Sequence, residues 1–354
     1  MSFETIIFVL MSLTIGTAYG FIAQREQFCF SGGIKDIILF KHTRRTASLI
    51  VAITTTIILT QLLGLYLDTN YKETRYFSDI NYLFIILGGA LFGYGMMISD
   101  GCSSRHLIKV GQGEKESLYI VISLGFFAYL TYTLLGFFGS NIYNNSFIQL
   151  FQSKVAYAVP LVFVLIFIAF LLYKSVQKCV NIFQTWDGFL IGILVTLGWF
   201  TTDFFYNYLF LDQSFQSLSF IYPLGKSIEF ITTGFDFQII FAFSVLSMLG
   251  VILGSFISAR TNTKYSKKQM CDNSMMNPPS LKMKLFGGAC MGVGGILAIG
   301  CTVGQGLSGV STLSLGSFVA IGSIYISAYI TAIYMNKKNA LIACFVFDFT
   351  KKNN

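Results

Sequence analysis

Several apolar runs in this chain are long enough to cross a lipid bilayer, and they limit what the chain can fold into. The runs at 155–173 and 237–259 are examples, and 18 or more apolar residues are typical of a membrane-spanning helix. Only 11% of the residues are charged, against roughly 25% in soluble domains. The sequence therefore predicts an all-α polytopic protein in the lipid bilayer, with one transmembrane domain over 1–354.

About nine transmembrane helices are predicted. The first run carries Glu4 where a signal peptide would have basic residues, so we interpret it as a true span rather than a cleaved leader. The segment 340–350 is too short to span and is expected to be re-entrant or interfacial. The predicted spans are 3–23, 46–67, 82–99, 117–140, 155–174, 186–210, 237–259, 285–299 and 311–335.

Lysine and arginine are concentrated in alternate loops. Cytoplasmic loops carry an excess of these residues, so the alternation predicts a multi-pass protein with its N-terminus outside and its C-terminus in the cytoplasm. The same rule accounts for the net charge of +8 without a nucleic-acid partner. The basic loops hold Arg25, Lys35, Lys41, Arg44 and Arg45; Arg105, Lys109 and Lys115; Lys174 and Lys178; Arg260, Lys264, Lys267, Lys268, Lys282 and Lys284; and Lys337 and Lys338.

One stretch of the sequence occurs twice. GGALFGYGMMISDGC at 88–102 and GGACMGVGGILAIGC at 287–301 agree at seven of fifteen positions, with an offset of 199 residues. Glycines alone would be explained by close helix packing, but the matched Gly-Cys ends indicate an internal repeat. We therefore predict two halves, 1–154 and 155–354, with opposite orientations in the membrane.

Inverted repeats are typical of transporters, whose substrate site lies where the halves meet. Both copies are short and interrupted by glycine, so we expect half-spanning or re-entrant helices with irregular backbone lining a cavity. A third stretch, GTAYGFIAQREQFCFSGGIKD at 16–36, also ends an apolar run in a cysteine. Its expected counterpart is 187–203, where Gly188 and Gly192 repeat the spacing of Gly16 and Gly20 but no cysteine occurs.

Three of the seven cysteines are candidates for a functional site. Cys29, Cys102 and Cys301 each stand at a glycine- or serine-rich break beside an expected helix end, where backbone N–H groups favour anions. A thiol is a weak donor and a soft contact, so an anion that contains sulfur suits this pattern. Arg105 is either an attractant for anions or a positive-inside anchor. Cys179, Cys271, Cys290 and Cys344 are expected to be structural or incidental.

The sequence offers no metal site and no cofactor site. Its only histidines are His42 and His106, and no C-x-x-C pair occurs, so ligands at useful spacing are too few.

Three motifs resemble the YeeE/YedE family of sulfur-compound transporters. They are GFIAQREQFCFSGGIKD, DGCSSRHLIKVGQG and GCTVGQGLSGVSTLSLGS, and the similarity covers nearly the whole chain. The resemblance implies a bacterial inner-membrane importer of thiosulfate rather than an enzyme. It also implies an hourglass shape and a path on which Cys29, Cys102 and Cys301 relay the ion by S–H hydrogen bonds.

The expected mechanism follows from the charge of the ion. A bare dianion in hydrocarbon is very costly, so we expect its oxygens to meet backbone N–H groups near four glycines, helped by three polar side chains. Burial keeps a thiol protonated, and neutral thiols donate to the ion's sulfur. The glycines are Gly32, Gly101, Gly300 and Gly304, and the side chains are Ser31, Thr302 and Gln305.

Two alternatives stay open from the sequence. One is a transporter of another sulfur or selenium species. The other is a membrane sulfurtransferase that uses Cys102 covalently, with Arg105 and His106 close in sequence. The resemblance further implies a separate small cytoplasmic sulfur-carrier protein as partner. The basic loop 260–284 is either its docking surface or a solvated positive-inside loop.

Overall fold

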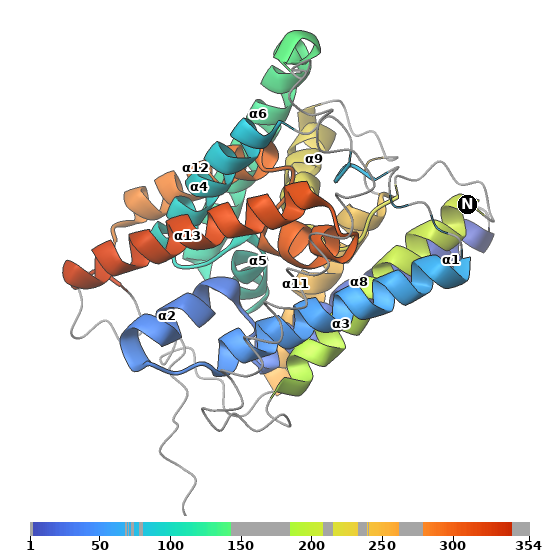
Figure 1. Ribbon diagram of the computed structural model, residues 1–354, viewed down its shortest axis with the longest axis horizontal. Helices are drawn as coiled ribbons and strands as arrows, with labels where there is room; N and C mark the ends of the chain where they lie inside the picture. Colours follow the sequence, from blue (N-terminus) through green and yellow to red (C-terminus); the bar gives the residue numbers. More distant parts are fainter. Residues whose placement is uncertain are drawn as a thin grey trace, which may run out of the picture.

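The computed structural model describes residues 3–67, 69, 71, 74–77, 81–142, 185–207, 215–232, 239, 241–261 and 279–341, and these ranges contain helices and no strands (Figure 1). The predicted span at 155–174, the loop at 262–278 and the segment from 342 onward lie outside the described residues. The helices are α1 (Phe3–Arg25), α2 (Phe30–Phe40), α3 (Arg44–Leu67), α4 (Tyr82–Ile98), α5 (Ser103–Gly111), α6 (Lys115–Ile142), α8 (Trp186–Asn207), α9 (Ile221–Thr232), α11 (Phe243–Thr261), α12 (Leu281–Leu297), the π-helical η6 (Gly304–Gly309) and α13 (Leu315–Lys337).

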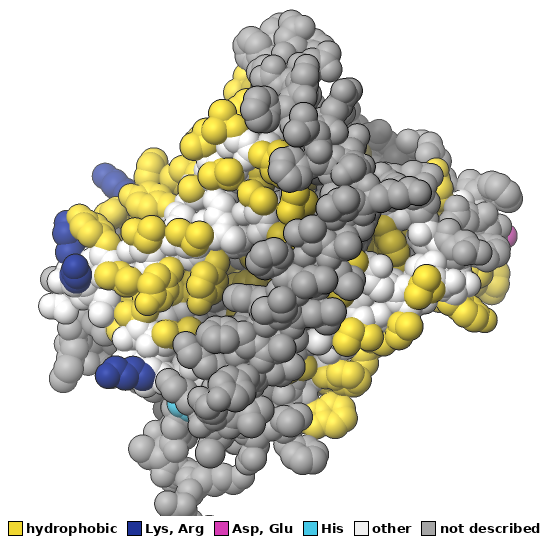
Figure 2. All heavy atoms as spheres, in the orientation of Figure 1, with side chains coloured by type: hydrophobic (Ala, Val, Ile, Leu, Met, Phe, Trp, Pro, Cys, Tyr) yellow, Lys and Arg dark blue, Asp and Glu magenta, His cyan; other side chains and the backbone are white. Residues whose placement is uncertain are grey.

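The predicted all-α polytopic membrane fold is confirmed. Seven segments of the described chain are long and apolar enough to cross a membrane. All the predicted spans except 155–174 correspond to a long helix. Figure 2 shows apolar side chains over much of the surface, with Lys and Arg side chains at its left-hand edge. Many large apolar side chains are exposed, as a lipid-facing surface requires.

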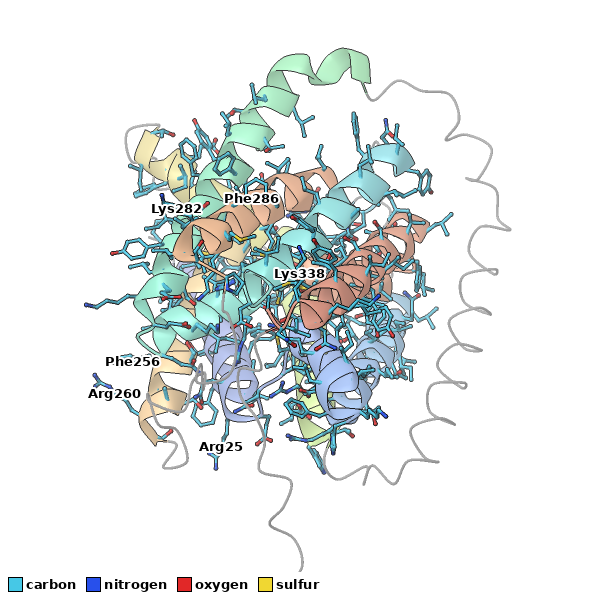
Figure 3. The ribbon with its side chains drawn as sticks, turned by 90° about the vertical axis from the view of Figure 1, so that its left-hand side faces the viewer. Arg25, Phe256, Arg260, Lys282, Phe286 and Lys338 are labelled. Atoms are coloured by element: carbon cyan, nitrogen blue, oxygen red, sulfur yellow. The ribbon has the colours of Figure 1, made fainter. Side chains whose placement is uncertain are left out.

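Basic residues at several helix ends lie on one side of the molecule. Figure 3 turns that side toward the viewer and labels Arg25 at the end of α1, Arg260 near the end of α11, Lys282 near the start of α12 and Lys338 after α13. These helix ends come from both parts of the sequence, so their common location is a property of the fold.

The long helices form two packed groups, joined by short helices. One group contains α1, α3, α8 and α11, and the other contains α4, α6, α12 and α13. Each short helix contacts both groups: α2 and η6 touch α3 and α13, while α5 and α9 touch α11 and α6. The short helices therefore lie where the two groups meet.

Helix packing follows a pattern that occurs twice. The contact of α1 with α11 corresponds to the contact of α8 with α3. The contact of α4 with α13 corresponds in the same way to the contact of α12 with α6. The remaining large contact, between α4 and α12, joins the two copies of the repeated sequence to each other.

Glycine determines how closely α1 and α11 approach. A Cβ added to Gly16 would lie 2.0 Å from the Ser247 carbonyl oxygen, and one on Gly254 would lie 1.9 Å from the Thr17 carbonyl oxygen. At these positions the backbone of one helix contacts the backbone of the other, because glycine has no side chain between them. Small residues drive helix association in membranes in this way.

Two pairs of the repeated glycines do the same between α4 and α12, and this corrects one expectation. Gly88 and Gly95 face α12, while Gly287 and Gly294 face α4. All four lie inside continuous helices and do not interrupt them. The helices instead end after the glycines, directly before the two Gly-Cys pairs.

Gly254→Ala is expected to destabilise the protein, whereas Gly322→Ala is not. The first places a methyl group against the α1 backbone, and overpacking of this kind costs roughly 1–3 kcal/mol of unfolding free energy. Gly322 has open space at its Cβ position, and Gly to Ala in a helix gains roughly 0.5–1 kcal/mol. Thermal unfolding of the two purified variants in detergent measures both changes in stability. Equal changes in the two variants would contradict the packing explanation.

Candidate functional site

Three helix breaks have one backbone design. In each, a residue other than glycine adopts the left-handed conformation: Gln27 (φ 57°), Asp100 (φ 66°) and Ile299 (φ 59°). The N–H of the next residue then closes the preceding helix end, in the manner of a Schellman motif. These bonds run from Phe28 N to Ala23 O (3.1 Å), from Gly101 N to Met96 O (3.0 Å) and from Gly300 N to Gly295 O (2.8 Å).

Each break delivers a cysteine to the start of a new helix. Cys29 is the N-cap of α2 and Cys102 is the N-cap of α5. Cys301 precedes the helical segment 302–311, whose centre is η6, and π-helical turns are frequent at functional sites. The sulfur of Cys29 accepts the Gly32 N–H (3.4 Å), and that of Cys301 accepts the Gly304 N–H (3.3 Å).

The structure brings these three breaks together. The Cys29 and Cys102 side chains lie close enough to interact with each other, and Thr302 lies beside Cys102. The Tyr19 side chain of α1 lies close enough to all three thiols to interact with them electrostatically. Cys29 is 7% exposed, and Cys102 and Cys301 are fully buried. All three are free thiols, so a cluster of unoxidised sulfur atoms is enclosed by three helix starts.

Short polar contacts hold the thiols in place. The Ser31 hydroxyl lies 3.1 Å from the Cys29 sulfur, and the Ser104 hydroxyl lies 3.2 Å from the Cys102 sulfur. The Gln305 amide donates to the Ala298 carbonyl (2.6 Å) and packs beside Gly300. The polar side chains that the sequence analysis singled out, Ser31 and Gln305, therefore lie at the helix breaks beside Cys29 and Cys301.

The N–H groups of the four glycines themselves are bonded within the protein, and the predicted ion contacts by N–H groups near them stay a prediction. Gly32 and Gly304 donate to cysteine sulfur, and Gly101 and Gly300 donate to the preceding helices. The first N–H groups of a helix have no partner within it, so the donors left at these helix starts belong to the residues beside the glycines.

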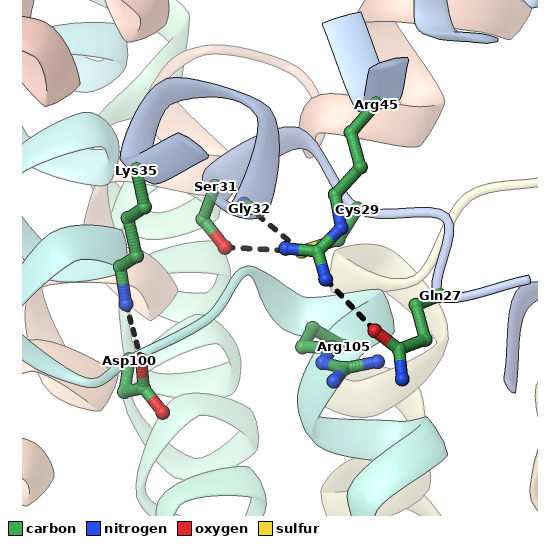
Figure 4. Close-up of a pocket in the computed structure, with 8 residues that line it drawn as sticks. All are labelled: Gln27, Cys29, Ser31, Gly32, Lys35, Arg45, Asp100 and Arg105. Atoms are coloured by element: carbon green, nitrogen blue, oxygen red, sulfur yellow. Dashed lines mark hydrogen bonds and ion pairs between the residues drawn. The ribbon is translucent and has the colours of Figure 1, made fainter. Parts of the chain in front are cut away.

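A small cavity of about 20 Å³ adjoins Cys29 (Figure 4). Asp100 pairs with Lys35 of α2 and with Lys109 of α5, the latter at 2.9 Å. Arg45 of α3 pairs with Asp36 at 3.1 Å and hydrogen-bonds Gln27 at 2.8 Å. The cavity is lined by Gln27, Cys29, Ser31, Gly32, Lys35, Arg45, Asp100 and Arg105.

Four residues predicted as loop cations are buried inside the protein. Lys35, Arg45, Arg105 and Lys109 are each 6% exposed or less, because α2, α3 and α5 bring them around buried acids. Sequence reasoning therefore missed that Asp100 and its cations adjoin the thiols. The available signal was a charged residue beside an apolar span, which marks a site by default.

The fourth short helix begins beyond the stretch 187–203. The stretch 187–203 lies inside α8, where Gly188 and Gly192 contact α3. The short helix of this part of the chain is α9, and the residue that precedes it, as Cys29 precedes α2, is Phe220. Its ring centroid lies 5.4 Å from that of Tyr19, so an aromatic side chain takes the place of a fourth thiol.

Among the described cysteines, Cys290 lies apart from this cluster. Cys290 is buried in α12 beside Gly95, in the contact between helices; Cys179, Cys271 and Cys344 lie outside the described residues. Among the residues that the structure describes, no group of His, Cys, Asp or Glu is arranged to hold a metal ion.

Fold and site together define a polytopic helical membrane protein with a buried thiol cluster beside paired charges. The chain belongs to the sulphur transport family, whose model matches residues 25–330.

Curated relatives agree with this membership. The chain is 24% identical over 330 residues to the thiosulfate transporter TsuA of Escherichia coli, covering 84% of this chain and 86% of that protein. It is 25% identical over 353 residues to the thiosulfate transporter TsuA of Spirochaeta thermophila, covering 87% and 93%. A probable transporter of Escherichia coli, YedE, is 21% identical over 106 residues, covering 29% and 24%.

Asp100→Gly and Ile299→Gly form a matched pair, because both residues have the same left-handed backbone. Asp100→Gly leaves Lys35 and Lys109 without their shared carboxylate, which is expected to cost roughly 3–5 kcal/mol of unfolding free energy. Ile299→Gly relieves a strained branched residue and loses partial packing, so a change within about 1 kcal/mol is expected. The unfolding free energies of the two variants, measured in detergent, test this prediction. An equal loss of stability in both variants would show that the ion pairs of Asp100 do not contribute to stability.

Proposed function

We propose that the protein imports thiosulfate through a narrow path on which Cys29, Cys102 and Cys301 bind the ion in turn. The observation that carries the proposal is the gathering of three free thiols at three helix starts in one buried cluster. Membership of the sulphur transport family supports it, as do relatives named thiosulfate transporters.

The proposed architecture has two inverted halves, 1–154 and 155–354, around this path. The packing pairs that occur twice support it, since each pair joins one helix of each half, and exchanging the halves turns each pair into its counterpart. The proposed location is the bacterial inner membrane, with the N-terminus outside and the C-terminus in the cytoplasm. The basic helix ends on one side of the molecule fit the cytoplasmic face of this orientation (Figure 3).

The proposed path replaces the ion's hydration with protein contacts. Thiosulfate oxygens would accept N–H groups from the helix starts beside Gly32, Gly101, Gly300 and Gly304, where the helix dipoles also favour an anion. The ion's terminal sulfur would accept S–H donation from each neutral thiol. Several weak sites of similar strength let an ion enter and leave without being trapped.

Polar side chains would assist at defined points of this path. Ser31 is hydrogen-bonded to the first thiol, and Thr302 adjoins the second. Gln305 lies beside Gly300 with one amide N–H already bonded to the Ala298 carbonyl, so its second N–H would donate to the ion. Arg105 lies beside Cys29 and would attract the anion.

Cys102→Ala is expected to abolish growth on thiosulfate in a bacterium that lacks its own sulfate and thiosulfate importers. A hydrogen bond to a charged group contributes about 1.5–3 kcal/mol, so initial uptake should fall on the order of tenfold or more. Cys290→Ala removes a buried thiol outside the cluster and is the control, at matched membrane levels. Equal growth of both variants would overturn the cysteine path, and no growth with the parent protein would overturn the substrate.

A covalent mechanism is the second candidate. The Cys102 thiolate would attack the outer sulfur of thiosulfate, the S–S bond would break, and sulfite would leave with the electron pair. His106 is the nearest candidate base by sequence, but its Nδ1 lies 3.2 Å from the Ser117 hydroxyl. The contact of Cys102 with Cys29 and Thr302 therefore favours non-covalent transport over a sulfurtransferase.

Intact-mass measurement separates these two mechanisms. After incubation with thiosulfate, the purified protein is expected to keep its mass, because hydrogen-bonded transport leaves no bond behind. A persulfide would add one sulfur atom, about 32 Da. A stable adduct that Cys102→Ala abolishes would instead establish the enzyme.

The choice of ion and partner rests on the same proposal. Other sulfur or selenium anions are the alternative substrates, and competition with labelled thiosulfate distinguishes them. A separate small cytoplasmic sulfur-carrier protein is the proposed consumer of the imported ion, with the loop 260–284, mostly outside the described residues, as its docking surface.

A further inference from the structure

A groove of about 590 Å³ lies on the surface between α4 and α13, away from the thiol cluster. Two residues of α4 and seven residues of α13, between Val319 and Thr331, line it. Its largest apolar side chains are open to the surroundings: Ile86, Ile326 and Ile330 are all exposed. The groove is therefore a surface feature that the packing of the protein itself leaves uncovered.

The hydroxyl groups of the groove are already used as donors within the protein. Ser323 donates to the Ile86 carbonyl oxygen at 2.7 Å. Ser327 donates to the Ala90 carbonyl oxygen at 2.5 Å, and Thr331 donates to the Ser327 carbonyl oxygen at 2.8 Å. A ligand in the groove would meet hydrocarbon surface and no free hydroxyl donor, so the lining suits an apolar chain.

The corresponding contact of α12 with α6 carries larger side chains. Ser123 of α6 donates to the backbone of α12 (3.0 Å) as Ser323 of α13 does to that of α4, so α13 corresponds to α6 with an offset of 323 − 123 = 200. At the positions of Gly322 and Ser327, α6 has isoleucine and phenylalanine. A Cβ on Gly322 would meet nothing within 4 Å, so the two small residues of α13 open the groove.

The groove has about the length of one leaflet of a bilayer. Val319 and Thr331 are 331 − 319 = 12 positions apart, which is about 18 Å along an α-helix. The hydrocarbon core is about 30 Å thick, or about 15 Å for one leaflet. A helix of a second chain would cross the whole core, whereas a single acyl chain occupies one leaflet, so the length favours a lipid.

The face of α13 that lines the groove continues into an aromatic residue and two lysines. Tyr334 follows Ile330 by four positions, and Lys337 and Lys338 follow Tyr334 by three and four, which places them on one side of the helix. Lys338 Nζ lies 4.6 Å from the Tyr334 ring centroid, and Figure 3 shows Lys338 on the side of the basic helix ends. Tyrosine and lysine are typical of the membrane interface, where lysine attracts anionic headgroups.

We propose that this groove binds one anionic phospholipid, with an acyl chain along α13 and the phosphate at Lys337 and Lys338. In the orientation proposed above, the lipid belongs to the cytoplasmic leaflet. The inference does not depend on which ion the protein transports. The bound chain would cover the exposed isoleucines and contact both α4 and α13, so it would stabilise the folded protein in proportion to its affinity.

The test is native mass spectrometry of the purified, delipidated protein, titrated with phosphatidylglycerol or phosphatidylcholine. The wild-type protein is expected to bind one phosphatidylglycerol with a Kd on the order of tenfold or more below that for phosphatidylcholine, because two lysines face the phosphate. Lys337→Gln together with Lys338→Gln should remove this preference. Lys282→Gln removes an exposed cation on the same side of the molecule, at the start of α12, and should leave the preference unchanged.

Gly322→Ile introduces the residue that α6 has at this position and is expected to weaken the binding of both lipids. If this variant does not fold, Ser327→Phe makes the matching change at the second small position.

Three results would overturn the lipid site. The first is equal affinity of the wild-type protein for the two lipids, or a preference that survives the loss of both lysines. The second is unchanged lipid binding after the groove is filled, because the chain would then lie elsewhere. The third is a dimer that the groove-filling variant dissociates, which would make a second copy of the protein the occupant. Transport of thiosulfate does not enter any of these measurements, so the proposed function is tested separately.

Discussion

The site depends on one constraint: a helix that ends within the protein core must have its backbone polar groups satisfied there. No water in hydrocarbon can do this. The chain meets the constraint three times with one hydrogen-bond pattern, in which the residue after the left-handed position closes the old helix and the following cysteine starts the new one. The thiols are therefore fixed by backbone geometry, which explains how three segments far apart in sequence present the same chemical group.

The two groups of long helices hold these breaks in place. Their members approach so closely at glycine that backbone meets backbone, while the short helices each touch both groups. A movement of one group against the other would therefore displace the short helices α2, α5, α9 and η6, which carry or adjoin the thiols. Rigid groups around short, interrupted helices are the arrangement that transporters use to place a binding site.

Much of the fold could be predicted because hydropathy is a local property. The spans followed from apolar runs, and the helix breaks before Cys102 and Cys301 followed from the Gly-Cys pairs. The charges around Cys29 could not be predicted, since Lys35 and Lys109 resemble ordinary loop lysines until the fold brings Asp100 between them. The break at Phe220 was missed because no cysteine marks it. The role of the repeated glycines as contacts, rather than breaks, depended on which helix faces which.

Two chemically different side chains occupy the centre of the left-handed turn: Asp100 in one copy of the repeated sequence and Ile299, at a cost in backbone strain, in the other. Because the closing hydrogen bonds come from backbone groups, the central residue can be exchanged while the turn persists. Exchange of this residue therefore alters the charge beside a thiol while the backbone bonds that place the sulfur atom persist. The cost is the stability that the ion pairs of Asp100 contribute, so charge and stability are linked at this position, whereas the thiol geometry is not.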